Sequence, residues 1–208
     1  MYETDQEQIE AIKSWWNQNG NWVIGGFIAF ILAYSGYYVY ESSVREHKLA
    51  GSAIYDELMG LEDSDTETRQ TLIAQLKNDY DDLTYSVLAS MDEAKGAVEA
   101  DDLDSALTEL SWAEKHADST LLPVVQYRKA QVLYGKNELD KALSVLSAIK
   151  GDGHQALTLE LKGDVLLAQG KLDEARTAYQ QAFDSSTKQN INNPYLKMKV
   201  DDLAQAVE

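Results

Sequence analysis

The sequence predicts an all-α protein in which one membrane-spanning helix is followed by a solenoid of stacked helix pairs. Three observations support this fold class. Residues that favour helices, such as Ala, Leu, Glu, Lys and Gln, are abundant, and only two prolines occur among 208 residues. Residues 14–40 carry no charged side chain. Further along, a pattern of small and apolar residues recurs at intervals of 36 and 33 residues.

The charge balance excludes several classes of function. The 35 acidic and 18 basic residues give a formal net charge of -17. Nucleic-acid binding requires a concentrated basic surface, and so does docking on anionic lipid headgroups. The chain has no cysteine, which excludes disulfides, thiolate metal sites and cysteine nucleophiles. We therefore expect no nucleic acid among its partners.

The uncharged stretch predicts an uncleaved membrane anchor at residues 22–40, preceded by a short acidic tail at residues 1–21. A helix of 19 residues is about 28 Å long, close to the thickness of the hydrocarbon core. Trp and Tyr side chains flank both ends, as expected at the two headgroup layers. A buried core helix and a signal peptide are the alternatives. A signal peptide begins with basic residues, whereas this tail is acidic and has the single cation Lys13.

The orientation and the contacts of the anchor are less determined. Lys13 precedes the span while Arg45 and Lys48 follow it, so a positive-inside count slightly favours a cytoplasmic location for the larger part. The span contains no ionisable residue, which argues against a proton or ion pathway. Small residues on one face could let another helix approach closely, although membrane helices are generally rich in Gly and Ala. These candidate intramembrane contacts are Gly25, Ala29, Ala33 and Gly36.

Residues 41–83 are predicted to form a helical connection and a first helix pair. The helix of the span continues through residues 42–60, and residues 62–66 interrupt it. Residues 66–80 form a second helix, with Leu72, Ile73 and Leu76 on one side.

Residues 84–208 are predicted to form the repeats and a C-terminal capping helix. Each copy has a small residue, a second small residue 12 positions later, and two further positions 4 and 7 beyond it. Small side chains at these positions let two antiparallel helices cross closely, and consecutive pairs must stack because one pair cannot bury its apolar face alone. The three copies are Ala94, Ala106, Leu110 and Ala113; Ala130, Ala142, Leu146 and Ile149; and Gly163, Ala175, Tyr179 and Ala182.

Turns and loops are expected between these helices. Asn137 and Gly170 can adopt the left-handed conformation that a tight turn within a pair requires. Loops between pairs are expected at residues 118–123 and 151–154. Residues 190–194 should end the third pair, and residues 195–207 should form the amphipathic capping helix.

The pattern over residues 84–184 resembles tetratricopeptide repeats, whose period is about 34 residues. The copies are divergent, because Glu93, Lys129 and Lys162 stand where that motif has a large apolar residue. The layout as a whole resembles the YfgM-type family, the ancillary subunits of the bacterial SecYEG translocon. This resemblance rests on the acidic tail at residues 2–13, the motif WWxxNG at residues 15–20, the segment IKGDG at residues 149–153 and the segment LKGDVLLAQGK at residues 161–171.

The resemblance implies a cytoplasmic N-terminal tail, one inner-membrane helix and a periplasmic repeat domain, which is a type II single-pass topology. It also implies association with the SecYEG translocon, with a PpiD-type periplasmic chaperone and with translocating client proteins. The implied role is to help transfer translocated proteins to the periplasmic chaperone network. This topology differs from the charge count, which is too nearly balanced to decide. The alternative is a regulator that binds and sequesters a signalling protein in an envelope stress response.

The sequence shows no arrangement of residues suited to catalysis, cofactor binding or metal binding. His47, His116 and His154 are far apart and have no ligand partner at helical spacing. Phosphate-binding loops and nucleophile motifs are absent. Paired acids such as Asp101 and Asp102 fall at expected helix ends, where carboxylates are solvated. We therefore expect a protein that is not an enzyme and that needs no cofactor or metal.

The remaining candidate site is a partner groove on the concave face, which the first helix of each pair lines in solenoids of this kind. Tyr127 and Tyr134 are the strongest candidate anchors, because aromatic side chains dominate binding energies. Packing between helices is the competing interpretation of each residue. The groove could hold a helix or an extended peptide. Its residues would be Leu88, Met91, Lys95 and Val98 in the first pair, Val124, Tyr127, Gln131 and Tyr134 in the second, and Leu157, Glu160, Asp164 and Leu167 in the third.

Overall fold

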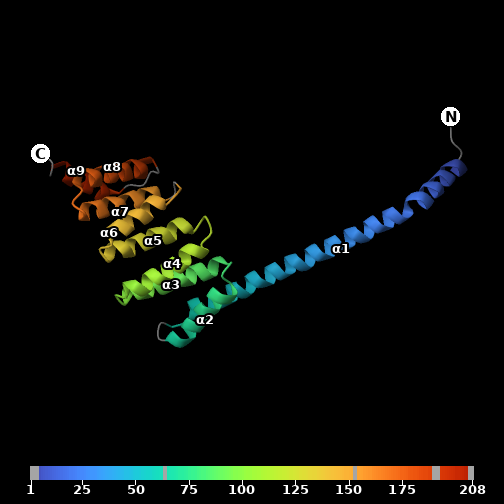
Figure 1. Cartoon of the computed structure of the whole chain (residues 1–208), viewed down its shortest axis with the longest axis horizontal. Helices are drawn as coiled ribbons and strands as arrows, with labels where there is room; N and C mark the ends of the chain where they lie inside the picture. The colour runs from blue at the N-terminus through green and yellow to red at the C-terminus, as the bar shows by residue number, and fades with distance from the viewer. Residues whose placement is uncertain (1–4, 63–64, 152–153, 189–192, 206–208) are drawn as a thin grey trace. The chain divides into compact units, whose positions relative to one another are not determined.

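Figure 1 shows the computed structural model, which describes residues 5–62, 65–151, 154–188 and 193–205. Within these ranges the chain is helical and has no strand, as the sequence predicts. Two compact units divide it at residue 50, Met1–Ala50 and Gly51–Glu208. The helices are α1 (Asp5–Gly60), α2 (Thr66–Asp79), α3 (Thr84–Glu99), α4 (Leu103–His116), α5 (Leu122–Gly135), α6 (Leu139–Ala148), α7 (Gln155–Ala168), α8 (Leu172–Lys188) and α9 (Pro194–Gln205).

Helix α1 is continuous from the acidic tail through the apolar stretch. An 18-residue window within it has a mean hydropathy of 1.6, and none of that window is buried in the protein. Its large apolar side chains, including Trp22, Phe27 and Phe30, are exposed. By length and composition this helix can cross a membrane.

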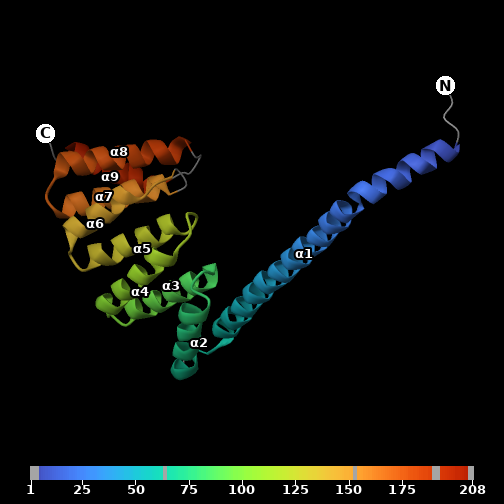
Figure 2. The same ribbon diagram turned by 45° about the vertical axis from the view of Figure 1, so that its right-hand side comes forward.

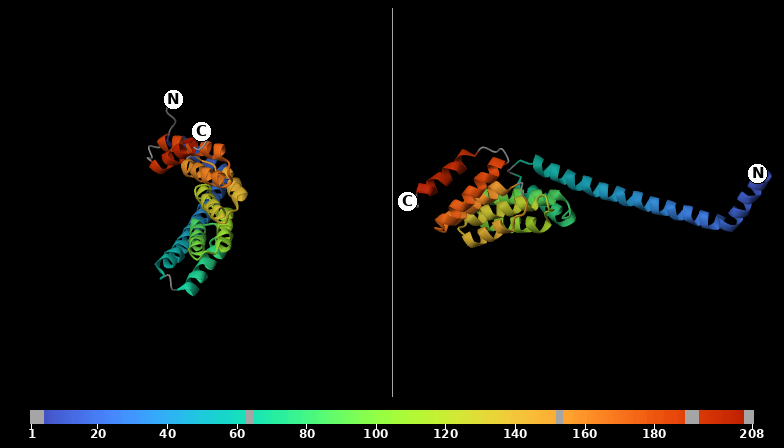
Figure 3. Two further views of the ribbon diagram at one scale, coloured as in Figure 1. Left: turned by 90° about the vertical axis from the view of Figure 1, so that its left-hand side faces the viewer. Right: turned by 90° about the horizontal axis from the view of Figure 1, so that it is seen from above.

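The second unit is a stack of antiparallel helices (Figures 1 and 2). Residues 51–60 of α1 pack with α2, and α3 with α4, α5 with α6 and α7 with α8 form the three pairs predicted from the repeats. Helix α9 packs against α8 and ends the stack. The helices from α3 to α9 follow a curved path in the left panel of Figure 3. The predicted helical solenoid is therefore confirmed.

Each of the three pairs turns in the same way. Asp101, Asn137 and Gly170 have positive φ angles of 60°, 61° and 75°. The amide of the following residue donates a hydrogen bond to the carbonyl five positions earlier, with N···O distances of 2.8 to 3.0 Å. This is the Schellman geometry, in which a left-handed residue ends a helix and satisfies its last carbonyls. The sequence predicted this conformation for Asn137 and Gly170 but not for Asp101.

The repeated small residues are the core of the solenoid. All the motif positions are buried except Ile149, which is partly exposed. In each copy the first small residue is followed 16 positions later by a large one. The large residue is Leu110 after Ala94 and Leu146 after Ala130, but Tyr179 after Gly163. A Cβ atom on Gly163 would lie 2.4 Å from a ring carbon of Tyr179, so glycine provides the room for the larger ring.

The charged residue Lys129 is accommodated by an ion pair. Its Nζ atom donates a hydrogen bond of 2.7 Å to Glu114 of α4, and Gln126 donates a second one to the same carboxylate at 3.1 Å. Burial alone would raise the pKa of Glu114, but these donors and the charge of Lys129 outweigh it and hold the pKa below its ordinary value of 4.5. An ion pair thus joins two repeats where the usual motif has apolar packing.

We expect the substitution Glu114→Gln to reduce the acid sensitivity of folding. Because the folded state lowers the pKa of Glu114, its carboxylate stabilises the fold above pH 4.5, and this contribution is lost as the pH falls below that value. Urea unfolding between pH 7 and pH 3 should show wild type and variant converging at the acidic end. Glu174→Gln, at an exposed position of α8, is the matched control. Parallel curves for wild type and Glu114→Gln would contradict this account.

Some sequence predictions fall partly outside the described residues. These are the loop at residues 151–154, of which 152 and 153 are not described, and the break at residues 190–194, of which 190–192 are not described. Residues 63 and 64 of the first interruption and the end of the capping helix at residues 206–207 also lie outside.

Candidate functional site

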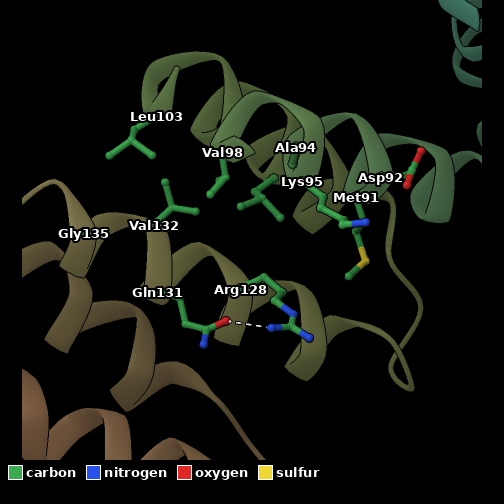
Figure 4. Close-up of a pocket in the computed structure, with 11 residues that line it drawn as sticks. Met91, Asp92, Ala94, Lys95, Val98, Leu103, Arg128, Gln131, Val132 and Gly135 are labelled. Carbon is green, nitrogen blue, oxygen red and sulfur yellow. Dashed lines mark hydrogen bonds between the residues drawn. The ribbon is translucent and has the colours of Figure 1, made fainter. Parts of the chain in front are cut away.

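A cavity of about 680 Å³ lies between α3 and α5 in the repeat unit. Figure 4 shows the side chains of the two helices facing each other across it. Helix α4, which connects α3 to α5, contributes Leu103 and Leu110 to its lining. The lining residues are Met91, Asp92, Ala94, Lys95, Val98, Leu103, Leu110, Arg128, Gln131, Val132 and Gly135.

The floor of this α3–α5 groove is apolar. Ala94, Leu110 and Val132 are buried and belong to one hydrophobic cluster, and Met91 and Leu103 pack against it. Val98 also lines the cavity and remains 42% exposed. Such a floor can take up apolar side chains of another molecule, because transferring them from water is favourable.

The rim of the groove carries two cations and one compensated carboxylate. Asp92 forms an ion pair with Arg69 of α2, so its charge is already neutralised. Lys95 lies 3.6 Å from Glu99, but both side chains are highly exposed and such pairs are weak. Arg128 donates a hydrogen bond of 3.0 Å to the amide oxygen of Gln131, as the dashed line in Figure 4 shows. No carboxylate partner of Arg128 is found in the described part of the chain.

The structure brings four of the predicted groove residues together and separates the others. Met91, Lys95, Val98 and Gln131 line the cavity. Tyr127 is half-buried and packs against the cluster that contains Ala130 and Leu161. Tyr134 is 37% exposed. Leu88 and Val124 are half-buried and do not line this cavity, and Leu157 and Leu167 are exposed on α7.

In the third pair, the predicted groove residues Glu160 and Asp164 bind a side chain from the capping helix. Lys199 of α9 donates hydrogen bonds to Glu160 at 3.0 Å and to Asp164 at 2.7 Å. Tyr179 donates its hydroxyl to Asp164 at 2.7 Å, and the ammonium of Lys199 lies 5.3 Å from the centre of the tyrosine ring. An internal network therefore occupies this part of the face.

The network shifts the acid–base properties of its members. Burial raises the pKa of the Tyr179 hydroxyl, and its hydrogen bond to the carboxylate of Asp164 raises it further. Burial disfavours the charge of Lys199, but the hydrogen bonds to Asp164 and Glu160 are stronger and raise its pKa. Lys199 therefore stays charged over the physiological range.

Sequence reasoning did not single out Arg128, Leu103, Leu110 or Val132 as groove residues. Arg128 could have been found, because it lies four residues after Val124 and three before Gln131 and so shares their helical face. Leu103 and Leu110 come from the second helix of the first pair. They line the cavity because α4 packs against both α3 and α5, and no local sequence pattern reveals these contacts between helices.

Groups that could hold a metal ion are not found in the described part of the chain, where no three His, Cys, Asp or Glu side chains converge. His116 is engaged locally. Its ring stacks on Trp112 at 4.0 Å between centroids, and its Nδ1 atom lies 2.9 Å from the Trp112 carbonyl oxygen. This arrangement fits helix packing.

Comparison with known proteins places the chain in a family. Residues 13–205 match the model of a tetratricopeptide repeat-like domain. A Haemophilus influenzae protein named ancillary SecYEG translocon subunit is 30% identical over 200 residues, which cover 96% of this chain and 97% of that protein. The chain belongs to the family of ancillary SecYEG translocon subunits. Proteins of the same name from Escherichia coli K12 and Neisseria gonorrhoeae are 28% and 26% identical, over 98% and 96% of this chain.

The sequence motifs indicated the family of ancillary SecYEG translocon subunits, and this resemblance is confirmed. The alignments extend over nearly the whole chain and therefore include the apolar span as well as the repeats. In the span, Gly25, Ala29, Ala33 and Gly36 are all exposed, and a Cβ atom on either glycine would meet nothing within 4 Å. The stripe of small residues is thus uncovered within the first unit.

Proposed function

We propose that this chain is a non-catalytic interaction module, anchored in the inner membrane beside the SecYEG translocon, that helps transfer translocated proteins to periplasmic chaperones. Its N-terminal tail would be cytoplasmic and its repeat domain periplasmic. The observation that carries the proposal is an exposed apolar helix joined to a repeat unit, in a chain matched over 96% of its length by a relative named as a translocon subunit. Such an anchor raises the effective concentration of the repeat unit at the membrane.

The partners in this proposal are the SecYEG translocon, a PpiD-type chaperone and translocating clients. The α3–α5 groove and the exposed residues Tyr134, Leu157 and Leu167 are the surfaces available to them. We further propose that the stripe of small residues in the span contacts a helix of the translocon. Small residues let two helices pack closely within the membrane.

The topology can be tested directly because the chain has no cysteine. Arg176→Cys places a thiol at an exposed position of α8, and Glu10→Cys places one in the tail. In intact cells, a membrane-impermeant maleimide should label the first variant, and it should label the second only after permeabilisation. The reverse result would overturn the periplasmic location and favour a cytoplasmic regulator.

The translocon contact can be tested by purifying the tagged full chain in a mild detergent. SecYEG should be recovered with wild type and with Gly26→Leu, which lies off the stripe. Its recovery should drop several-fold with Gly25→Leu, because the added side chain keeps the partner helix away. Equal recovery with both variants would exclude the stripe as the contact, and no recovery with wild type would overturn the proposed function.

A further inference from the structure

The α3–α5 groove is an exception to the acidic character of the chain. The formal net charge is -17, yet two of the eleven residues that line the groove are cations. Asp92 is the one carboxylate in this lining, and it is held by Arg69. The groove therefore presents positive charge beside an apolar floor.

We propose that the α3–α5 groove binds an acidic, apolar peptide segment of a partner protein, with an apolar side chain in the cavity and a carboxylate on Arg128 and Lys95. This inference rests on the proposed function as an interaction module and names the chemistry of its ligand. It uses a different part of the molecule from the intramembrane contact proposed above.

The apolar part of the ligand is indicated by the floor. A cavity of about 680 Å³ bordered by Met91, Val98 and Val132 has room for more than one aliphatic or aromatic side chain. Leu110, at its base, is almost fully buried, so the floor is a fixed part of the core and needs no rearrangement before binding.

The acidic part of the ligand is indicated by Arg128. Its guanidinium has five N–H donors, and the contact with Gln131 uses one nitrogen, Nη1. A planar guanidinium suits a carboxylate because it can donate two parallel hydrogen bonds. Gln131 holds the side chain at the cavity in Figure 4, which reduces the entropy that binding would cost.

A basic ligand fits the groove less well. Asp92 would have to release Arg69 before it could pair with an incoming cation, and Lys95 and Arg128 would repel that cation. The net charge of -17 repels acidic chains at long range, so only a segment that reaches both cations gains from binding. We therefore expect a selective interaction rather than a general affinity for acidic proteins.

The test uses the full chain in nanodiscs of zwitterionic phosphatidylcholine and fluorescein-labelled peptides of about ten residues. The first peptide alternates leucine with glutamate, the second replaces each glutamate by glutamine, and the third replaces it by lysine. Fluorescence anisotropy should show the glutamate peptide binding at least about tenfold more tightly than the other two. Empty nanodiscs are the control for partition into lipid.

Matched variants assign the binding to the groove. Arg128→Gln should raise the Kd of the glutamate peptide by about tenfold, whereas Arg176→Gln, the same change on exposed α8, should leave it unchanged. Val98→Ser should also weaken binding, because it removes apolar surface at the cavity. The proposal is overturned if no peptide binds, if the glutamine or lysine peptide binds as tightly, or if the two arginine variants behave alike.

These outcomes are separable from those of the proposed function. If SecYEG is recovered with the tagged chain but the glutamate peptide does not bind, the ligand chemistry is wrong and the role at the translocon stands. If the peptide binds but SecYEG is not recovered, the groove is a recognition site and the role at the translocon is wrong.

Discussion

Replacing Gly163 by alanine should destabilise the repeat unit by about 1–3 kcal/mol, the usual cost of overpacking a core. The added methyl group would lie 2.4 and 2.5 Å from two ring carbons of Tyr179. That ring is almost fully buried and cannot move aside without displacing its neighbours. The clash should outweigh the gain in helix propensity of about 1 kcal/mol that alanine otherwise brings.

Urea unfolding of the full chain, followed by circular dichroism, measures this effect. Gly96→Ala on α3 is the matched control, because a Cβ atom there meets nothing within 4 Å. It should stabilise the protein. The double variant Gly163→Ala with Tyr179→Leu recreates the pairing of Ala94 with Leu110 and should be more stable than Gly163→Ala alone. If Gly163→Ala were as stable as Gly96→Ala, the ring would not be the reason for the glycine.

Replacing Lys199 by methionine should cost about 1–3 kcal/mol, because the carboxylates of Glu160 and Asp164 would then face each other without a cation. Methionine keeps most of the aliphatic stem, so the loss reports mainly on the charge. Unfolding measurements at neutral pH should show the destabilisation. Adding Glu160→Gln and Asp164→Asn to Lys199→Met should recover part of it, since neutral amides do not repel each other.

The same network predicts a dependence on alkaline pH. Folding raises the pKa of Lys199 above 10.5, so its contribution is complete below that pH and is lost as the pH rises through the higher value of the folded state. The difference in stability between wild type and Lys199→Met should therefore shrink above pH 10.5. Lys197→Met, at an exposed position of the same helix, controls for the loss of one charge. A constant difference between wild type and Lys199→Met would show that packing, and not charge, explains the cost.

The sequence predicts the fold well because each repeat is marked by small residues at fixed distances along the chain. Small residues such as Ala106, Ala142 and Ala175 recur at intervals that only helix pairs can use, and the structure buries all of them. Asp101 was missed because aspartate adopts positive φ angles less readily than glycine or asparagine. Its position one repeat before Asn137 is the signal that could have identified it.

The candidate site is less predictable because it depends on contacts between repeats. Helical spacing alone placed Glu160 and Asp164 on an open face, and it could not show that Lys199, 35 residues beyond Asp164, reaches back to them. Helical spacing could have placed Arg128 on the face of Gln131, but it could not show that Lys129 pairs with Glu114 of another helix. Arg128 and Lys129 are adjacent in sequence, yet one lines the cavity while the other pairs with Glu114.

Asp92, Glu160 and Asp164 form ion pairs within the chain, so negative charge acts differently at long range and at close range. These three carboxylates lie on first helices of the pairs. Asp92 pairs with Arg69, whereas Glu160 and Asp164 share Lys199. Other carboxylates, for example those of Asp173, Glu174 and Asp184, lie at exposed positions of α8. At a distance, the net negative charge makes copies of the protein repel one another. At close range, a partner that reaches Asp92, Glu160 or Asp164 meets a carboxylate that already has a cation of the same chain beside it.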